Sequence, residues 1–148
     1  MYKNAEHNTD TLNVINNHFF VTGSHSDNAL DLWIMNKKKP IFSLKNCHRD
    51  SSWLLSTAGV KSSDLLATGS YDGFVNLYKF NNIAKTLEKT QELGDLPGCI
   101  NDLKFSNTRG ADKRGIMLAV SHSNEEKFGR WHVQKKVKTG ITLLRKVD

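Results

Sequence analysis

Residues 65–80 read LLATGSYDGFVNLYKF, two apolar runs on either side of a short polar turn. The turn holds Tyr71-Asp72-Gly73, and an Asp-Gly pair between apolar runs is a strong hairpin signal because both residues tolerate positive φ. Neither run shows the 3.6-residue periodicity of an amphipathic helix. The segment therefore predicts two antiparallel β-strands joined by a tight turn.

The same segment recurs in two other parts of the chain, as FFVTGSHSDNALDLWIM at residues 19–35 and MLAVSHSNEEKFGRWHV at residues 117–133. Trp33 and Tyr78 are 45 residues apart, and Tyr78 and Trp131 are 53 residues apart. The first spacing matches the roughly 40 to 45 residues of a four-stranded propeller repeat. The second fits that repeat with an insertion, TRGADKRG, at residues 108–115.

The repeat predicts an all-β fold of about three four-stranded antiparallel blades. The blades are expected at residues 10–46, 50–93 and 98–147. The strands are expected near Leu12–Ile15, Phe19–Gly23, Ala29–Ile34, Ile41–Leu44, Trp53–Ala58, Leu65–Ser70, Phe74–Lys79, Leu87–Glu92, Ile100–Phe105, Ile116–Ser121, Phe128–Val133 and Gly140–Arg145.

These segments resemble WD40 repeats, in which an entry His, a second-strand Ser or Thr, a turn Asp and a third-strand Trp form a hydrogen-bonded chain. Such a chain satisfies every buried polar group, because the indole donates, the hydroxyl donates and accepts, and the imidazole passes the bond to a carboxylate. The matching positions are His48, Thr68, Asp72 and Tyr78 in the second repeat, Thr22, Asp27 and Trp33 in the first, with His7 as a candidate entry His, and Trp131 in the third, where Asn124 stands nearest the Asp position.

Four sequence segments are more specific than the general WD40 pattern. They are LPGCINDLKFSNT at residues 96–108, GRWHV at 129–133, GITLLRKV at 140–147 and LDLWIMNKKKPIFSLKNCH at 30–48. They are similar to the last repeats of WD40 proteins that interact with U3 small nucleolar RNA. The resemblance implies a noncatalytic RNA–protein scaffold of the U3 small nucleolar ribonucleoprotein, acting in pre-ribosomal RNA processing and small-subunit biogenesis in the nucleolus. The implied partners are U3 RNA and box C/D ribonucleoprotein or pre-ribosome proteins, with no cofactor and no small-molecule substrate.

A closed propeller needs about four to eight blades, so three blades cannot complete a ring. We therefore expect the chain to be a C-terminal fragment or a truncated gene product. Exposed blade faces and unpaired strand edges would favour self-association.

The chain has 148 residues, a net charge of +6 and a pI near 9.4, and this positive charge favours a polyanionic partner.

Cys47 and Cys99 form no CxxC pair and lie near no metal-ligand cluster, so we expect two reduced, buried thiols and no metal site. No apolar run approaches the roughly 20 residues needed to cross a bilayer, so a membrane protein is not expected.

Basic residues in or beside the expected loops are the candidate contacts with RNA or a partner. They are Lys37, Lys38, Lys39, Arg109, Lys113, Arg114, Lys127, Arg130, Lys135, Lys136 and Lys138. Each short run of these basic residues, taken alone, is also explained as an ordinary solvent-exposed surface with no ligand. The alternative function is a generic WD40 protein-interaction adaptor that does not touch RNA.

Two short segments could suggest a hydrolase, Ser24-His25 with Asp27 and Ser121-His122 with Glu125. Tight turns direct neighbouring side chains to different faces, and no group is specified to orient the base. These residues are better explained as turn formers, so catalysis is not expected.

Overall fold

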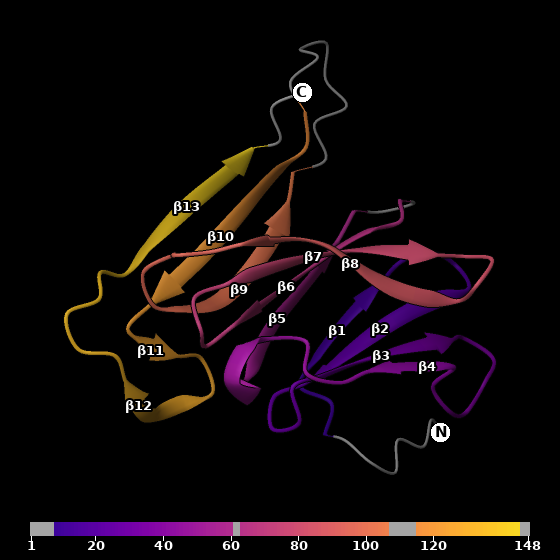
Figure 1. The fold of residues 1–148 in the computed structure, drawn as a ribbon, viewed down its shortest axis with the longest axis horizontal. Helices are drawn as coiled ribbons and strands as arrows, with labels where there is room; N and C mark the ends of the chain where they lie inside the picture. Colours follow the sequence, from indigo (N-terminus) through magenta and orange to yellow (C-terminus); the bar gives the residue numbers. More distant parts are fainter. Residues whose placement is uncertain (1–7, 61–62, 107–114, 146–148) are drawn as a thin grey trace.

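The structure is a computed structural model that describes residues 8–60, 63–106 and 115–145, with residues 130 and 131 described as backbone only. The first sheet has the order β1-β2-β3-β4 and the second the order β5-β6-β7-β8, with antiparallel neighbours (Figure 1). The strands of these sheets are β1 Thr11–Val14, β2 Phe19–Ser24, β3 Ala29–Ile34, β4 Phe42–Leu44, β5 Leu54–Gly59, β6 Leu65–Ser70, β7 Val75–Asn81 and β8 Thr86–Leu93. A short 3-10 turn, Arg49–Ser51, lies between them. The predicted all-β class is confirmed, and no helix in the described ranges is long and apolar enough to cross a membrane.

The second blade packs on a neighbouring blade with each of its two faces, because successive side chains of a strand point to opposite faces. In β6, Leu66 belongs to the core shared with the first sheet, where Val21, Leu30 and Leu32 are buried. Ala67, the next residue, belongs to the core shared with the third sheet. The alternating side chains of β6 therefore contribute to both cores, and the second blade is buried on both faces.

The Thr-Gly-Ser sequence occurs at residues 22–24 and again at 68–70, and its glycine leaves space for a side chain of the neighbouring blade. A Cβ on Gly23 of β2 would lie 2.4 Å from Leu54 Cδ2, and a Cβ on Gly69 of β6 would lie 2.4 Å from Ile100 Cγ2. Leu54 and Ile100 lie on the first strand of the next sheet, and both are fully buried. The glycine thus recurs because an apolar side chain of the next blade occupies the space that its own Cβ would take.

The third blade departs from the expected strand order. Its described strands are β9 Cys99–Phe105, β10 Met117–Ser123, β11 Glu125–Glu126, β12 Gly129–Val133 and β13 Gly140–Arg145. β13 pairs directly with β10, giving the order β13-β10-β9, while β12 pairs only with the two-residue β11 among the described strands. The prediction that residues 128–133 form the third strand of this blade was therefore wrong.

The physical reason lies at the position that holds a hydroxyl in the other blades. Thr22 and Thr68 occupy it in β2 and β6, and the repeat alignment places Val120 there in β10. A valine offers no acceptor to a third-strand Trp, so the hydrogen bond that Trp33 makes to Thr22 in the first blade has no counterpart here. β13 instead places Leu144 into the core beside Leu118, which stabilises the observed order.

Candidate nucleic-acid interface

The entry loop of the second blade is organised around the buried His48. Its Nε2 lies 2.8 Å from Thr68 Oγ1, and its Nδ1 lies 3.3 Å from Asp72 Oδ2. The Asn28 side chain holds the His48 backbone on both sides, accepting from its N–H at 2.9 Å and donating to its carbonyl at 2.8 Å. The structure therefore brings together the three residues His48, Thr68 and Asp72 that the repeat pattern predicted.

Tyr78 enters this network by a different route from the one expected of a Trp. Its hydroxyl donates to the Cys47 carbonyl at 3.0 Å, and Asn76 Nδ2 donates to the same carbonyl at 2.6 Å. The carbonyl belongs to the residue before His48, so Tyr78 fixes the entry loop through its backbone. Burial raises the pKa of the Tyr78 hydroxyl and raises the pKa of the Cys47 thiol to about 12, so Cys47 is an unreactive thiol at neutral pH.

Asp72 is the charged end of the network. Burial acts to raise the pKa of its carboxyl, but the hydrogen bond and charge of His48 and the backbone amides of Phe74 and Arg49 outweigh it and hold the pKa below its usual value. The Phe74 amide donates to Asp72 Oδ1 at 2.9 Å and the Arg49 amide to Oδ2 at 3.2 Å. The carboxylate therefore ties the turn after β6 to the loop before β5.

The first blade forms only part of the predicted chain. Trp33 Nε1 donates to Thr22 Oγ1 at 2.9 Å, as the repeat pattern predicted. Asp27 accepts hydrogen bonds from Ser24 and Ser26, both at 2.9 Å, within its own turn. His7 lies outside the described residues.

The third blade lacks the predicted chain among its described side chains. His122, two residues after Val120, is buried with its Nε2 3.1 Å from Thr142 Oγ1. Trp131 belongs to β12, away from β10, and Asn124 lies in the turn before β11. Strand pairing with β13 therefore takes the place of the expected network.

The predicted basic contacts fall into two separate groups. Lys37, Lys38 and Lys39 are exposed in the turn between β3 and β4, whereas Lys135, Lys136 and Lys138 are exposed in the loop between β12 and β13. These two turns lie at opposite ends of the molecule (Figure 1). Arg109, Lys113 and Arg114 lie outside the described residues, as does the side chain of Arg130.

Lys127 joins the second group through the turn between β11 and β12. Its backbone N–H donates to Asn101 Oδ1 at 2.9 Å, and its Nζ lies 5.1 Å from the ring centroid of Phe128. Partial burial lowers the pKa of this lysine although the carboxylates of Asp102 and Asp10 act to raise it. The β11–β12 hairpin and the loop after it thus present four lysines from neighbouring positions of the chain.

An aromatic cluster that the sequence did not reveal holds this hairpin in place. The Trp53 ring lies 4.8 Å from that of His25, 4.9 Å from that of His132 and 5.5 Å from that of Tyr71, measured between centroids. Phe128 meets His25 edge-on at 5.2 Å. The cluster joins loops of all three blades, and the only local signal was an aromatic or His beside each turn.

A hydrogen bond from the first blade fastens the same hairpin. His25 Nε2 lies 3.1 Å from Glu126 Oε2, and the Glu126 side chain is only 1% exposed. Gln134 Nε2, just after β12, donates to the Tyr71 carbonyl at 3.0 Å. These bonds keep β12 and its basic loop on the aromatic cluster and away from β10.

The candidate catalytic residues are engaged in structural pairs. Ser24 donates to Asp27 while His25 is paired with Glu126, so the hydroxyl and the imidazole do not form a nucleophile–base pair. His122 pairs with Thr142. Among the described residues, no group of three His, Cys, Asp or Glu is placed to hold a metal ion.

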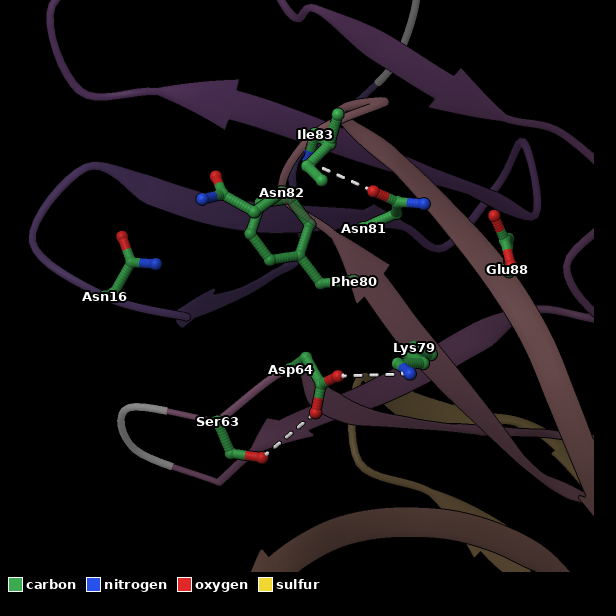
Figure 2. A pocket seen from close by; sticks show the side chains of 9 residues that line it. All are labelled: Asn16, Ser63, Asp64, Lys79, Phe80, Asn81, Asn82, Ile83 and Glu88. Carbon is green, nitrogen blue, oxygen red and sulfur yellow. Dashed lines mark hydrogen bonds and ion pairs between the residues drawn. The ribbon is translucent and has the colours of Figure 1, made fainter.

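A surface hollow beside β7 does not suit a polyanion. Figure 2 shows Lys79 directed at Asp64, with Nζ and Oδ2 3.7 Å apart, and Ser63 on the other side of the carboxylate. Its other lining residues are Asn16, Phe80, Asn81, Asn82, Ile83 and Glu88. Lys79 is the single cation of this lining and is already paired, so the hollow offers no free positive charge among these residues.

Comparison with known proteins finds relatives that match most of the chain. No protein-family model matches the chain. The U3 snoRNP-associated protein-like EMB2271 of Arabidopsis thaliana is 29% identical over 157 residues, covering 97% of this chain and 31% of that protein. The human U3 small nucleolar RNA-interacting protein 2 is 28% identical over 145 residues, covering 91% of this chain and 28% of that protein. The chain therefore spans less than a third of the length of these relatives.

The fold agrees with the sequence comparison. The solved structure described as "Structure of U3-55K" has a TM-score of 0.80 and 25% identity to this chain, covering 93% of this chain and 42% of the other. The solved structure described as "Crystal structure of RRP9 WD40 repeats" matches with the same TM-score, 0.80, and the same 25% identity. This chain is therefore made of WD40-type blades, and in sequence it is similar to proteins associated with the U3 small nucleolar ribonucleoprotein.

Proposed function

We propose that the chain is a noncatalytic RNA–protein scaffold of the U3 small nucleolar ribonucleoprotein, acting in pre-ribosomal RNA processing and small-subunit biogenesis. The observation that carries the proposal is the resemblance to U3-associated proteins over nearly the whole chain, in both sequence and fold. Nucleolar location and U3 RNA as a partner follow from the same resemblance.

The β11–β12 hairpin and the loop after it supply the best-supported RNA contacts. Lys135, Lys136 and Lys138 are exposed on a loop that starts from a structured anchor, the Gln134–Tyr71 hydrogen bond. Exposed lysines on a fixed loop can reach phosphate oxygens without disturbing the core. Lys37 to Lys39, at the other end of the molecule, suit a second contact with RNA or a protein.

Self-association stays a prediction. Leu12 and Val14 on β1 are exposed apolar side chains, and Ile141 and Leu143 are exposed on β13. Apolar side chains on outer blade faces favour contact with another surface.

The proposal predicts that reversing charge on the β12–β13 loop weakens binding to U3 RNA. The variant Lys135→Glu with Lys136→Glu should lose affinity and lower the slope of log affinity against log salt by about one for each phosphate contact removed. The matched control is Lys79→Glu with Lys85→Glu, which changes charge equally on a surface outside the proposed contacts.

Affinity is measured by fluorescence anisotropy with U3 RNA over a salt series, and a second variant adds reversal at Arg109, Lys113 and Arg114. The RNA contact would be contradicted by two results together. The first is that the Lys135/Lys136 variant binds U3 RNA as tightly as the Lys79/Lys85 control, and the second is that the variant with five reversals still binds U3 RNA. If that larger variant instead loses a protein partner from cell extract and keeps U3, the protein-interaction adaptor is the correct function.

A further inference from the structure

The hollow beside β7 is a possible binding site that the proposed RNA contacts do not use. It has a volume of about 940 Å³, and its lining runs from Asn16 in the β1–β2 turn to Glu88 on β8. Most of the lining belongs to the second blade, which has another blade packed on each face. The hollow is therefore bounded by turns inside the fold, and its volume suits a short peptide.

Two apolar side chains mark the middle and the rim of the hollow. The Phe80 ring packs on Phe19 of the first blade, with 4.9 Å between centroids, and lies at the centre of the lining in Figure 2. Ile83, in the turn after β7, is 95% exposed. A single exposed apolar side chain is ordinary, but one at the rim of a hollow with an aromatic floor can hold an apolar side chain of a ligand.

Two carboxamides of the lining have their oxygens engaged and their nitrogens available. Asn16 Oδ1 accepts from the backbone N–H groups of His18 at 2.8 Å and Phe19 at 3.0 Å. Asn81 Oδ1 accepts from those of Ile83 and Ala84, both at 3.0 Å. Within the described chain neither Nδ2 group has a partner. Each Nδ2 can therefore donate to a carbonyl oxygen of an extended peptide.

The charges of the lining favour a basic side chain. Lys79 and Glu88 face each other in the β7–β8 register, but Lys79 Nζ lies 3.7 Å from Asp64 Oδ2. Glu88 is exposed and forms no ion pair with any residue that the structure describes. The lining thus holds two carboxylates and one ammonium group, and the basic run at residues 37–39 is not part of it. A cationic side chain would complement Glu88.

We propose that this hollow binds an extended segment of a partner protein in which one residue separates a basic residue from an apolar residue. Alternate side chains of an extended chain point to the same side, so both can enter the hollow together. The apolar side chain packs on Phe80 and Ile83, and the basic one reaches Glu88. The inference goes beyond the proposed function and stands independently of the RNA contact.

The test uses the full chain and two capped, dye-labelled peptides, Thr-Arg-Thr-Leu-Thr and Thr-Leu-Thr-Arg-Thr, which present the pattern in both directions. Fluorescence anisotropy should show saturable binding of at least one of them. Replacing its leucine with serine should weaken binding by about tenfold, because the apolar contact is lost. Replacing its arginine with glutamate should weaken binding by about threefold or more, because like charges then meet.

Variants of the protein assign the binding to the hollow. Ile83→Asn should weaken binding by about fivefold, since the exposed side chain contributes apolar contact to the ligand and not to the core. Val133→Asn is the control, because it removes an exposed apolar side chain on β12, far from the β7–β8 turn in Figure 1. The urea midpoint of Ile83→Asn should equal that of the wild type, and an equal loss of binding in both variants would overturn the proposal.

Exchange of charge tests the role of Glu88. Glu88→Lys should weaken the arginine peptide and strengthen its glutamate counterpart, whereas Glu88→Gln should weaken the arginine peptide by a smaller factor. An arginine peptide that keeps its full advantage over the glutamate peptide in Glu88→Lys would contradict the assigned contact. Equal binding of the two peptides to the wild type, or no saturable binding of either arginine peptide, would also overturn the proposal.

Competition separates this site from the RNA contact. A U3 oligoribonucleotide should leave the peptide bound, and Lys135→Glu with Lys136→Glu should leave the affinity for the peptide unchanged. Displacement of the peptide by the U3 oligoribonucleotide would assign the hollow to RNA and overturn this inference, with the proposed function intact. Peptide binding by a protein that does not bind U3 RNA would support this inference and contradict the proposed RNA contact.

Discussion

The variant Gly69→Val is expected to lower the free energy of unfolding by about 1 to 3 kcal/mol, because valine would overpack the contact between the second and third blades. A Cβ at residue 69 would lie 2.4 Å from Ile100 Cγ2 and 2.7 Å from Ser56 Oγ. Both neighbours are buried, so neither can move into solvent. Urea unfolding measures the loss as a lower midpoint.

A double-mutant cycle shows whether the loss comes from this contact. Ile100→Ala alone removes a buried side chain and should cost about 2 to 5 kcal/mol. In the double variant the valine side chain occupies part of the space that Ile100 leaves, so the combined loss should fall short of the sum by about 1 kcal/mol or more. Ser121→Val is the control, since the repeat alignment places Ser121 at the Gly69 position on the face of β10 away from the second blade. Additive losses, or an equal loss in the control, would show that Gly69 does not serve as the contact point.

Asp72→Asn is expected to lower the free energy of unfolding by about 1 to 3 kcal/mol at pH 7, because it removes a charged acceptor from a buried network. Asp72 accepts from His48, Phe74 and Arg49, so the substitution weakens the entry loop and the hairpin turn together. The exposed Asp64→Asn is the control, and its 3.7 Å pair with Lys79 should contribute about 0.5 kcal/mol or less.

The difference between wild type and Asp72→Asn should depend on pH in a defined direction. The folded pKa of Asp72 is lowered, so its contribution is fully present above the unfolded value of about 3.9 and is lost as pH falls through the folded value. The two stabilities should therefore converge in acid. A difference that stays constant from pH 7 to strongly acidic pH would mean that the ionised carboxylate contributes nothing.

Strand positions in the first two blades could be predicted because several local signals coincide there. In the second blade the Asp72-Gly73 turn fixes the hairpin, and Gly73 has the positive φ of +80° that such a turn requires. Thr68, Asp72 and His48 could be predicted because they match the WD40 repeat pattern, and the structure joins them by the hydrogen bonds that this pattern implies. The expectation that Tyr78 replaces Trp directly was incomplete, since its hydroxyl reaches the Cys47 carbonyl instead.

Pairing in the third blade could not be predicted from strand pattern alone. β12 and β13 both read as strands, and periodicity does not say which one lies beside β10. The outcome depends on contacts far apart in sequence, such as His25 with Glu126 and Trp53 with His132. The basic residues were predicted as one candidate set, but only the fold shows that Lys37 to Lys39 and Lys135 to Lys138 lie at opposite ends.

The central claim is that these stacked blades serve a particle built on U3 RNA, and crosslinking in living cells examines it most directly. The protein is expressed in full length with an affinity tag, crosslinked by ultraviolet light and purified under denaturing conditions, and the attached RNA is sequenced. We expect U3 RNA to be strongly enriched over other small nucleolar RNAs of the same box C/D class. Recovery of U3 at the level found for an unrelated tagged WD40 protein would contradict the account.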